Sequence, residues 1–187
     1  MPTKKILETA VFAGGCFWCT EAVFKRLKGV VSVVSGYANA KMENPSYEDV
    51  STGETDAAEA IQLTFDPSII SYNKLMDVFW ATHDPTSLNR QGGDVGTQYR
   101  SAIFYMNEEQ KKIAIASRNK MEKSGEMEGN IVTEIKPLKK FFTAEEYHQN
   151  FYEKHKYTIP YCPLVIAPKI KKLLTKFGSE VKEEYKK

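Results

Sequence analysis

The sequence predicts an α+β fold, a two-layer sandwich of helices on a sheet. Segments with strand character and segments with helix character are interleaved along the chain, but they do not alternate strictly. Strict alternation would predict a doubly wound parallel sheet, so an α+β sandwich fits better. The 187 residues are 42% hydrophobic and contain no repeat, low-complexity tract or linker. We therefore expect one domain over residues 1–187, with a basic C-terminal helix or tail from about residue 168.

Strand and helix patterns follow one another in the first third of the chain. The apolar segment Ile6–Ala13 predicts a buried strand that ends at two glycines. Apolar residues at helical spacing in Phe17–Lys28 predict a helix, which Gly29 closes. Two more strands are expected at Val30–Ala38 and Ala58–Phe65, on either side of a polar stretch.

Residues that can cap helices mark the later elements. Ser71, Asn107 and Thr143 each precede a segment with helical character, and their side chains can accept N–H bonds at a helix start. The helices expected after residue 70 are Ser71–Thr82, Glu108 to about Lys123, Ala144 to about His155, and Ile170–Phe177. The strands expected there are Tyr99–Met106 and Ile131–Ile135.

The charge distribution excludes some classes of function. The formal net charge is +2, and the last twenty residues, Pro168–Lys187, carry seven Lys against three Glu. The basic excess lies in one tail, so the charge does not favour nucleic-acid binding. No apolar run is long enough to cross a bilayer, and Met1–Glu8 does not resemble a signal peptide. We therefore expect a cytoplasmic protein without a membrane segment.

The densest chemical signal is a cysteine that follows two glycines at the end of the first strand. Gly14 and Gly15 permit a sharp turn, and Cys16 then begins the predicted helix. The free N–H groups at a helix start favour a thiolate, so we expect the pKa of Cys16 to be lowered and Cys16 to be a nucleophile. The alternative is a small, buried apolar residue. The glycine turn and Cys19 favour the nucleophile.

Cys16 and Cys19 form a C-x-x-C pair with three possible meanings. The pair can be a redox dithiol, half of a zinc site, or a coincidence. A zinc site needs four ligands, and only Cys162 and three scattered histidines remain, so we expect no metal. Three cysteines in a reducing compartment also disfavour a structural disulfide framework.

The polar candidates are weaker on sequence alone. Glu59 lies between two alanines of a predicted strand, and burial there would raise its pKa and make it a proton donor. It can equally face solvent. Phe17 and Trp18 either pack in the core or form an apolar wall for a substrate methyl group. For Tyr47, Asp94 and Tyr99, surface or packing roles are the default.

Taken together, the motifs resemble those of the A-type peptide methionine sulfoxide reductases. The matching segments run through most of the chain in the family's order, and several matches at consistent spacing are more specific than one short motif. They are Gly15-Cys16-Phe17-Trp18, Asn44-Pro45-Ser46-Tyr47, Ala58-Glu59-Ala60, Phe79-Trp80, His83-Asp84-Pro85, Gly92-Gly93-Asp94 and Gly96–Ser101. The chain departs from the family at Asn39-Ala40 and Asp56-Ala57, in loops near Glu59, and Cys19 is often glycine in the family.

The resemblance implies both a fold and a reaction. The fold is a ferredoxin-like plait around a mixed sheet. The reaction is reduction of methionine-S-sulfoxide, free or in proteins, by a monomer that needs no metal or organic cofactor. The external dithiol that the resemblance implies is a thioredoxin. Cys16 matches the nucleophile and Glu59 the proton donor. Tyr47, Asp94 and Tyr99 match the hydrogen-bonding groups, and Phe17 with Trp18 match the methyl pocket.

The resemblance also bears on which thiol restores Cys16 after it becomes a sulfenic acid. The family often resolves with a cysteine after a tyrosine, which Tyr161-Cys162 matches. We expect Cys162 to act first and Cys19 in a later exchange. The prolines around Cys162 predict a non-helical segment lying across the surface. Two other hypotheses are a general thiol–disulfide oxidoreductase that uses the C-x-x-C pair, and a non-catalytic binder of oxidised methionine.

Overall fold

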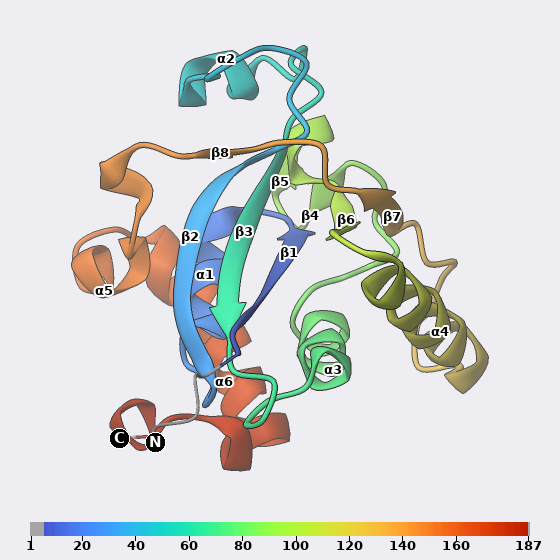
Figure 1. Ribbon diagram of the computed structural model, residues 1–187. Coiled ribbons are helices and arrows are strands. Elements are labelled where there is room, and N and C mark those ends of the chain that lie inside the picture. The colour runs from blue at the N-terminus through green and yellow to red at the C-terminus, as the bar shows by residue number, and fades with distance from the viewer. Residues whose placement is uncertain (1–5, 187) are drawn as a thin grey trace.

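The computed structural model describes residues 6–186 and contains a six-stranded sheet in the order β7-β6-β1-β3-β2-β8 (Figure 1). The strands are β1 (Glu8–Gly14), β2 (Val30–Ala38), β3 (Ala58–Phe65), β6 (Ser101–Tyr105), β7 (Glu134–Pro137) and β8 (Phe141–Thr143). Neighbours are antiparallel except β6 and β7, which are parallel, so the sheet is mixed. A separate hairpin joins β4 (Arg90–Gln91) and β5 (Asp94–Val95).

Six α-helices complete the fold. They are α1 (Phe17–Phe24), α2 (Tyr47–Ser51), α3 (Tyr72–Thr82), α4 (Glu108–Ser124), α5 (Phe151–His155) and α6 (Ala167–Phe177). With α1 and α3 as connections, strands β1, β2, β3 and β6 follow the β-α-β-β-α-β order of a ferredoxin-like plait, which confirms the predicted α+β class. Two of the three predicted caps, Ser71 and Asn107, are also confirmed. Ser71 accepts the N–H of Lys74 at 3.1 Å, and Asn107 accepts that of Gln110 at 2.8 Å.

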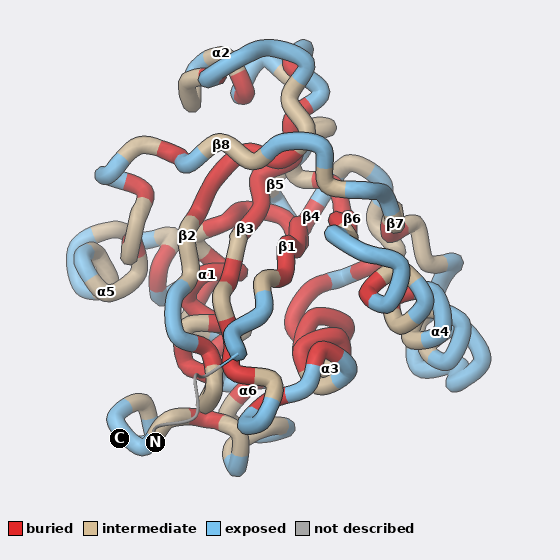
Figure 2. The backbone as a smooth tube through the Cα atoms, in the orientation of Figure 1, coloured by how far each residue is buried: buried red, intermediate tan, exposed pale blue. Residues whose placement is uncertain are grey.

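The two faces of the sheet are covered differently. On one face, large side chains such as Phe12, Leu63 and Phe79 form the main core with α1 and α3. In Figure 1, α1 and α6 lie behind the sheet. The other face carries mostly small residues. They pack under Leu138, which precedes β8, and Phe141, which begins it. Figure 2 shows buried backbone in the upper parts of β2 and β3 and along much of α1 and α3.

Several predicted boundaries shift. The first helix ends at Phe24 and not at Lys28, and residues 25–28 form turns before Gly29, whose φ is +83°. The strand expected at Ile131–Ile135 occupies Glu134–Pro137, because pairing with β6 sets its register. The polar stretch before β3 contains α2, which Ser46 and Asp49 begin with a capping box.

The helix predicted from Ala144 to His155 is wrong. Thr143 ends β8 and caps no helix, and a 3-10 turn at Glu146–His148 follows. Asn150 adopts the left-handed conformation with φ +56°, which ends any continuous helix, so only α5 forms. The backbone N–H groups of Asn150 and Phe151 are bound by the buried Glu21 carboxylate at 2.7 and 3.3 Å. Glu21 belongs to α1, so a contact between distant parts of the chain stabilises this break.

The segment around Cys162 also differs from expectation. Cys162–Ile166 forms a π-helical turn that continues into α6, and Cys162 is fully buried. The predicted surface segment is therefore wrong for Cys162. Pro163 and Pro168 lie in the first turns of these helices, where a missing N–H costs no helical bond. No helix within residues 6–186 is long and apolar enough to cross a membrane, and most of the N-terminal segment tested for a signal peptide lies outside the described residues.

Candidate active site

Cys16 lies where β1 turns into α1. It is the N-cap of α1 and is only 6% exposed. The turn depends on Gly15, whose φ is +93° and whose missing Cβ would lie 2.5 Å from Cγ of Gln91. A side chain at this position would push away the loop that carries Asp94, so the glycine brings that loop against the cysteine.

Glu59 is buried beside Cys16. It sits near the start of β3, is 2% exposed, and accepts the N–H of Phe17 at 3.0 Å through Oε2. Burial raises the pKa of Glu59 to about 8, and the hydrogen bond from Phe17 offsets only part of this effect. The carboxyl is therefore protonated at neutral pH. Of the two positions considered from the sequence, solvent-facing or buried, the structure has the buried one.

The pKa predicted for Cys16 is wrong in direction. Burial, a hydrogen bond with Cys19 and the proximity of Glu59 raise the pKa of the Cys16 thiol well above its ordinary value. The first N–H of α1 is donated to Glu59 and is not free to stabilise a thiolate. The lowered pKa belongs to Cys19 instead, at about 7, chiefly because of its hydrogen bond with Cys16.

Two phenols approach the same point from different elements. Tyr47 opens α2, and Tyr99 ends the 3-10 turn Thr97–Tyr99. Burial raises the pKa of both hydroxyls, and the charges of Glu59 and Cys16 add to the effect in each. Both phenols therefore remain protonated and can donate hydrogen bonds near the thiol and the carboxyl.

Asp94 is held by Tyr161, which was not among the predicted site residues. The hydroxyl of Tyr161 donates to Oδ2 of Asp94 at 2.6 Å and lies 3.7 Å from the sulfur of Cys19. Tyr161 also packs edge-on against Trp18, with ring centroids 5.7 Å apart. The only sequence signal for Tyr161 was its position before Cys162, so its place between a carboxylate and a thiol is a result of the fold.

An aromatic cluster forms one side of the site. The indole of Trp18 lies flat on Phe151, with centroids 3.7 Å apart and planes 4° apart, and its N–H donates to Nδ1 of His148 at 3.0 Å. Trp18 is half-buried, whereas Phe17 is 1% exposed and packs between His148 and Tyr37. The structure therefore brings the two predicted aromatics together, but Trp18 is the more accessible. Sequence reasoning missed His148 and Phe151, which lie in the segment wrongly expected to be one helix.

The three cysteines share one apolar cluster and are unbonded. Cys16, Cys19 and Cys162 are all buried there with Phe151, Ile166 and Ile170. Burial raises the pKa of Cys162, so Cys19 is the most acidic of the three thiols. Within residues 6–186 no group of three or more histidines, cysteines or carboxylates could hold a metal ion.

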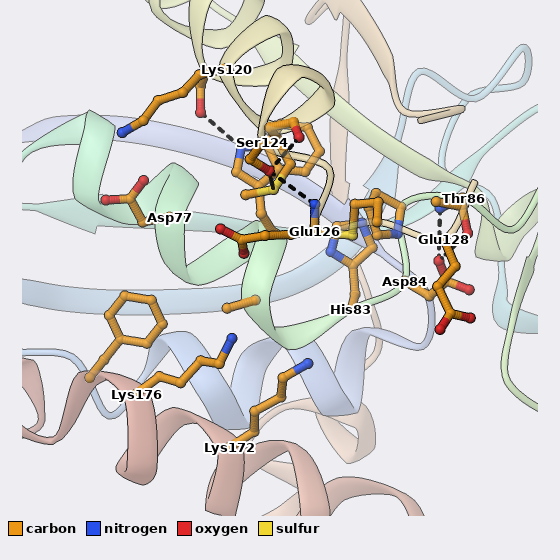
Figure 3. Close-up of a pocket in the computed structure, with 17 residues that line it drawn as sticks. Asp77, His83, Asp84, Thr86, Lys120, Ser124, Glu126, Glu128, Lys172 and Lys176 are labelled. Carbon is orange, nitrogen blue, oxygen red and sulfur yellow. Dashed lines mark hydrogen bonds between the residues drawn. The ribbon is translucent and has the colours of Figure 1, made fainter. Parts of the chain in front are cut away.

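A cavity lies away from the candidate site. A cavity of about 670 Å³ opens between α3, α4 and α6, and none of the predicted site residues lines it. Figure 3 shows Lys172 and Lys176 of α6 across from Glu126 in this cavity, with Asp77 of α3 nearby. Its lining mixes positive and negative groups, so it does not favour a ligand of one charge. Size alone therefore does not locate the candidate site.

Comparisons with known proteins agree with this geometry. Residues 8–181 match the family model described as "Peptide methionine sulfoxide reductase". The peptide methionine sulfoxide reductase MsrA of Saccharolobus solfataricus is 56% identical over 176 residues, which are 94% of this chain and 98% of the relative. Mxr1 from Saccharomyces cerevisiae in reduced form is similar with a TM-score of 0.76 and 34% identity, over 84% of this chain and 90% of that one. Mxr1 in complex with Trx2 matches with a TM-score of 0.55 and 25% identity, over 79% and 89% of the two chains.

Proposed function

The chain belongs to the peptide methionine sulfoxide reductase family, and from that membership we propose that Cys16 is the nucleophile and Glu59 the proton donor of the reaction. The chain is a peptide-methionine (S)-S-oxide reductase, an oxidoreductase acting on a sulfur group. The observation that carries the assignment of roles is the hydrogen bond from Phe17 to Glu59, because it holds the carboxyl beside the thiol, where burial keeps it neutral.

The proton donor acts on the sulfoxide oxygen. A sulfoxide is a poor electrophile until its oxygen is protonated or strongly hydrogen-bonded. Glu59, with a pKa of about 8, holds a transferable proton at neutral pH, and the hydroxyls of Tyr47 and Tyr99 donate hydrogen bonds at the same place. The substrate methyl group lies against Trp18, whose ring is braced by Phe151.

The nucleophile then attacks the sulfur of the substrate. The Cys16 sulfur bonds to the activated sulfur. The protonated oxygen then moves from the substrate sulfur to the Cys16 sulfur: a bond between this oxygen and the Cys16 sulfur forms, the sulfur–oxygen and sulfur–sulfur bonds to the substrate break, and methionine leaves a sulfenic acid on Cys16. The sulfoxide is reduced by two electrons to methionine, and Cys16 is oxidised by two. The proton lost by the Cys16 thiol restores the proton that Glu59 gave to the oxygen. These steps use no metal or organic cofactor.

Cys19 is the first thiol to condense with the sulfenic acid in this proposal. It is hydrogen-bonded to Cys16 and its pKa of about 7 makes it partly a thiolate at neutral pH. Attack on the sulfenic sulfur forms the Cys16–Cys19 disulfide and releases water. Cys162, in the same cluster, then receives the disulfide by exchange. This order reverses the one expected from the sequence.

An external dithiol returns the enzyme to its reduced form. We propose a thioredoxin as that dithiol, because the similar Mxr1 is known in complex with Trx2. The substrates are then methionine-S-sulfoxide, free or in oxidised proteins, and the cellular role is protein repair.

One assay separates this function from its alternatives. Thioredoxin-dependent consumption of NADPH is measured with methionine-S-sulfoxide and with the R epimer. Turnover of the S epimer alone, lost in Glu59→Gln, supports the proposal. A general thiol–disulfide oxidoreductase would reduce a disulfide substrate and would not need Glu59. A binding module would retain the S epimer without consuming NADPH.

A further inference from the structure

Glu145 connects three elements around the site without belonging to the catalytic set. Its Oε1 accepts the backbone N–H of Tyr47 at 2.7 Å, and its Oε2 accepts the hydroxyl of Tyr37 at 2.8 Å. The same Oε2 lies 3.7 Å from Nε2 of His148. One carboxylate therefore contacts α2, β2 and the 3-10 turn Glu146–His148.

Each partner of Glu145 touches a residue of the proposed site. Tyr47 is itself one of the two phenols. Tyr37 pairs with Glu59 across strands β2 and β3, and its ring packs on Phe17 with centroids 5.7 Å apart. His148 accepts the indole N–H of Trp18 at 3.0 Å. The contacts of Glu145 therefore reach both the phenol side and the aromatic side of the site.

The hydrogen bond from Trp18 determines what His148 presents to Glu145. Burial lowers the pKa of His148, so the ring is neutral at neutral pH. Since Nδ1 accepts from Trp18, the ring proton lies on Nε2, which is buried without a hydrogen-bond partner. The nearby carboxylate of Glu145 is charged, because hydrogen bonds from Tyr47, from Tyr37 and from its own backbone outweigh partial burial and lower its pKa. The negative charge of Glu145 beside Nε2 favours the tautomer with its proton on Nε2. In that tautomer Nδ1 is free to accept the hydrogen bond from Trp18.

We propose that Glu145 is a positioning residue for sulfoxide reduction, which holds Tyr47 directly and Trp18 through His148. The roles of Tyr47 and Trp18 rest on the proposed function, whereas the contacts of Glu145 do not. Glu145 does not touch the reacting atoms. It fixes the position of Tyr47, which hydrogen-bonds the sulfoxide oxygen, relative to Trp18, whose ring contacts the methyl group.

The kinetic test compares two neighbouring carboxylates. Glu145→Ala removes all three contacts, and Glu145→Gln is a milder variant that keeps the shape but loses the charge. Glu146→Ala is the matched control, because the side chain of Glu146 is 90% exposed and pairs with Lys154 at 3.7 Å. We expect Glu145→Ala to lower kcat/KM for methionine-S-sulfoxide by about 10- to 100-fold, since small misplacements of reacting groups have costs of this size. Glu146→Ala should stay within about twofold.

A spectroscopic readout separates positioning from a general loss of structure. The protein has two tryptophans, and the indole N–H of Trp80 is bound to Ser117 at 2.8 Å, remote from Glu145. In a proton–nitrogen correlation spectrum, assigned with Trp18→Phe, we expect both Glu145 variants to move the Trp18 indole signal and leave the Trp80 signal in place. Adding Glu145→Ala to a Trp18→Phe variant should lower activity by a smaller factor than adding it to wild type. The part of the effect of Glu145 that acts through the indole of Trp18 is already lost in Trp18→Phe.

Two results would overturn the proposal. One is an unmoved Trp18 signal in both Glu145 variants, and the other is a kinetic loss as large for Glu146→Ala as for Glu145→Ala. If the wild-type protein fails to reduce methionine-S-sulfoxide, the assigned roles of Tyr47 and Trp18 fail. The indole signal still decides whether Glu145 positions Trp18.

Discussion

The backbone N–H of Phe17 donates a hydrogen bond of 3.0 Å to Oε2 of Glu59, 42 positions further along the chain. This contact places a buried carboxyl next to the cysteine that begins α1. It also occupies the first free N–H of the helix, so burial dominates the pKa of Cys16. The acid and the thiol of the proposed reaction are both neutral before substrate binds.

Replacing the proposed nucleophile should abolish the reaction. In Cys16→Ser the hydroxyl cannot ionise near neutral pH and is a far weaker nucleophile, so we expect no turnover of methionine-S-sulfoxide above background. NADPH consumption measures turnover, and circular dichroism checks the fold. Substantial residual activity in the folded variant would contradict the role of Cys16.

Glu59→Gln should slow the chemical step more than it weakens substrate binding. Glutamine can hydrogen-bond the sulfoxide oxygen but cannot give it a proton, and general acid catalysis contributes about 10²–10⁴-fold. Single-turnover kinetics at neutral pH measure this step. Glu54→Gln, which changes an exposed carboxylate in the preceding loop, is the control.

The two phenols should matter less individually than Glu59. Either hydroxyl can partly replace the other, so we expect smaller losses in Tyr47→Phe or Tyr99→Phe alone than in Glu59→Gln. The double variant Tyr47→Phe/Tyr99→Phe measures how far each hydroxyl replaces the other. If the rate of the chemical step were unchanged in Glu59→Gln, another group would donate the proton to the sulfoxide oxygen.

The buried carboxyl should also make stability depend on pH. Its pKa is about 8 in the folded protein, against about 4.3 in an unfolded chain. The folded state therefore binds more protons between these values, and the stabilisation from neutral Glu59 is complete below about pH 4 and is lost as pH rises through 8. Denaturant unfolding across this range should show that the free energy of unfolding falls less with rising pH in Glu59→Gln than in wild type. An equal decline in both proteins would mean that Glu59 is ionised in the folded state.

The same protonation should shape the activity profile. Because the proposed proton donor is the neutral carboxyl, kcat/KM of wild type is expected to fall above about pH 8. Glu59→Gln should lack this descending limb, at a lower overall rate. The profile is measured with a chemical dithiol present in excess at every pH, so that the reductant does not limit turnover.

Tyr161→Phe should weaken the contact between the C-terminal segment and the site. The variant loses the 2.6 Å bond to Asp94 and the contact with Cys19. We expect the free energy of unfolding to fall by about 1 kcal/mol, the usual net worth of such a bond. The pKa of Cys19 should rise, because the hydroxyl of Tyr161 helps to lower it. Tyr157→Phe, at a 90% exposed position, is the control, and thiol alkylation rates against pH report the shift.

The order of disulfide formation can be read by mass spectrometry. After one equivalent of substrate, we expect a Cys16–Cys19 peptide to appear first, and to persist in Cys162→Ser. In Cys19→Ser the sulfenic acid should accumulate and be trapped by a dimedone probe. A dominant Cys16–Cys162 peptide at the earliest times would restore the order expected from the sequence.

Local signals in the sequence determined most of the elements. The alternation of apolar residues placed β2 and β3 correctly at Val30–Ala38 and Ala58–Phe65, and capping side chains placed the starts of α3 and α4. These features depend on neighbours within a few residues, so they can be read without knowing the fold. The glycine turn before Cys16 belongs to the same class, because it reflects the conformation of one residue.

Contacts between distant residues decided the rest. The break at Asn150 depends on the Glu21 carboxylate, 129 positions away, and no pattern near Asn150 announces it. Whether Glu59 was buried or exposed depended on strands on both sides and on the N–H of Phe17. The pKa of Cys16 then followed from burial, which outweighs the helix-start effect that the sequence suggested. Burial and long-range hydrogen bonds are properties of the assembled chain, so only the tertiary structure set the protonation of the site and brought Tyr161, His148 and Glu145 around it.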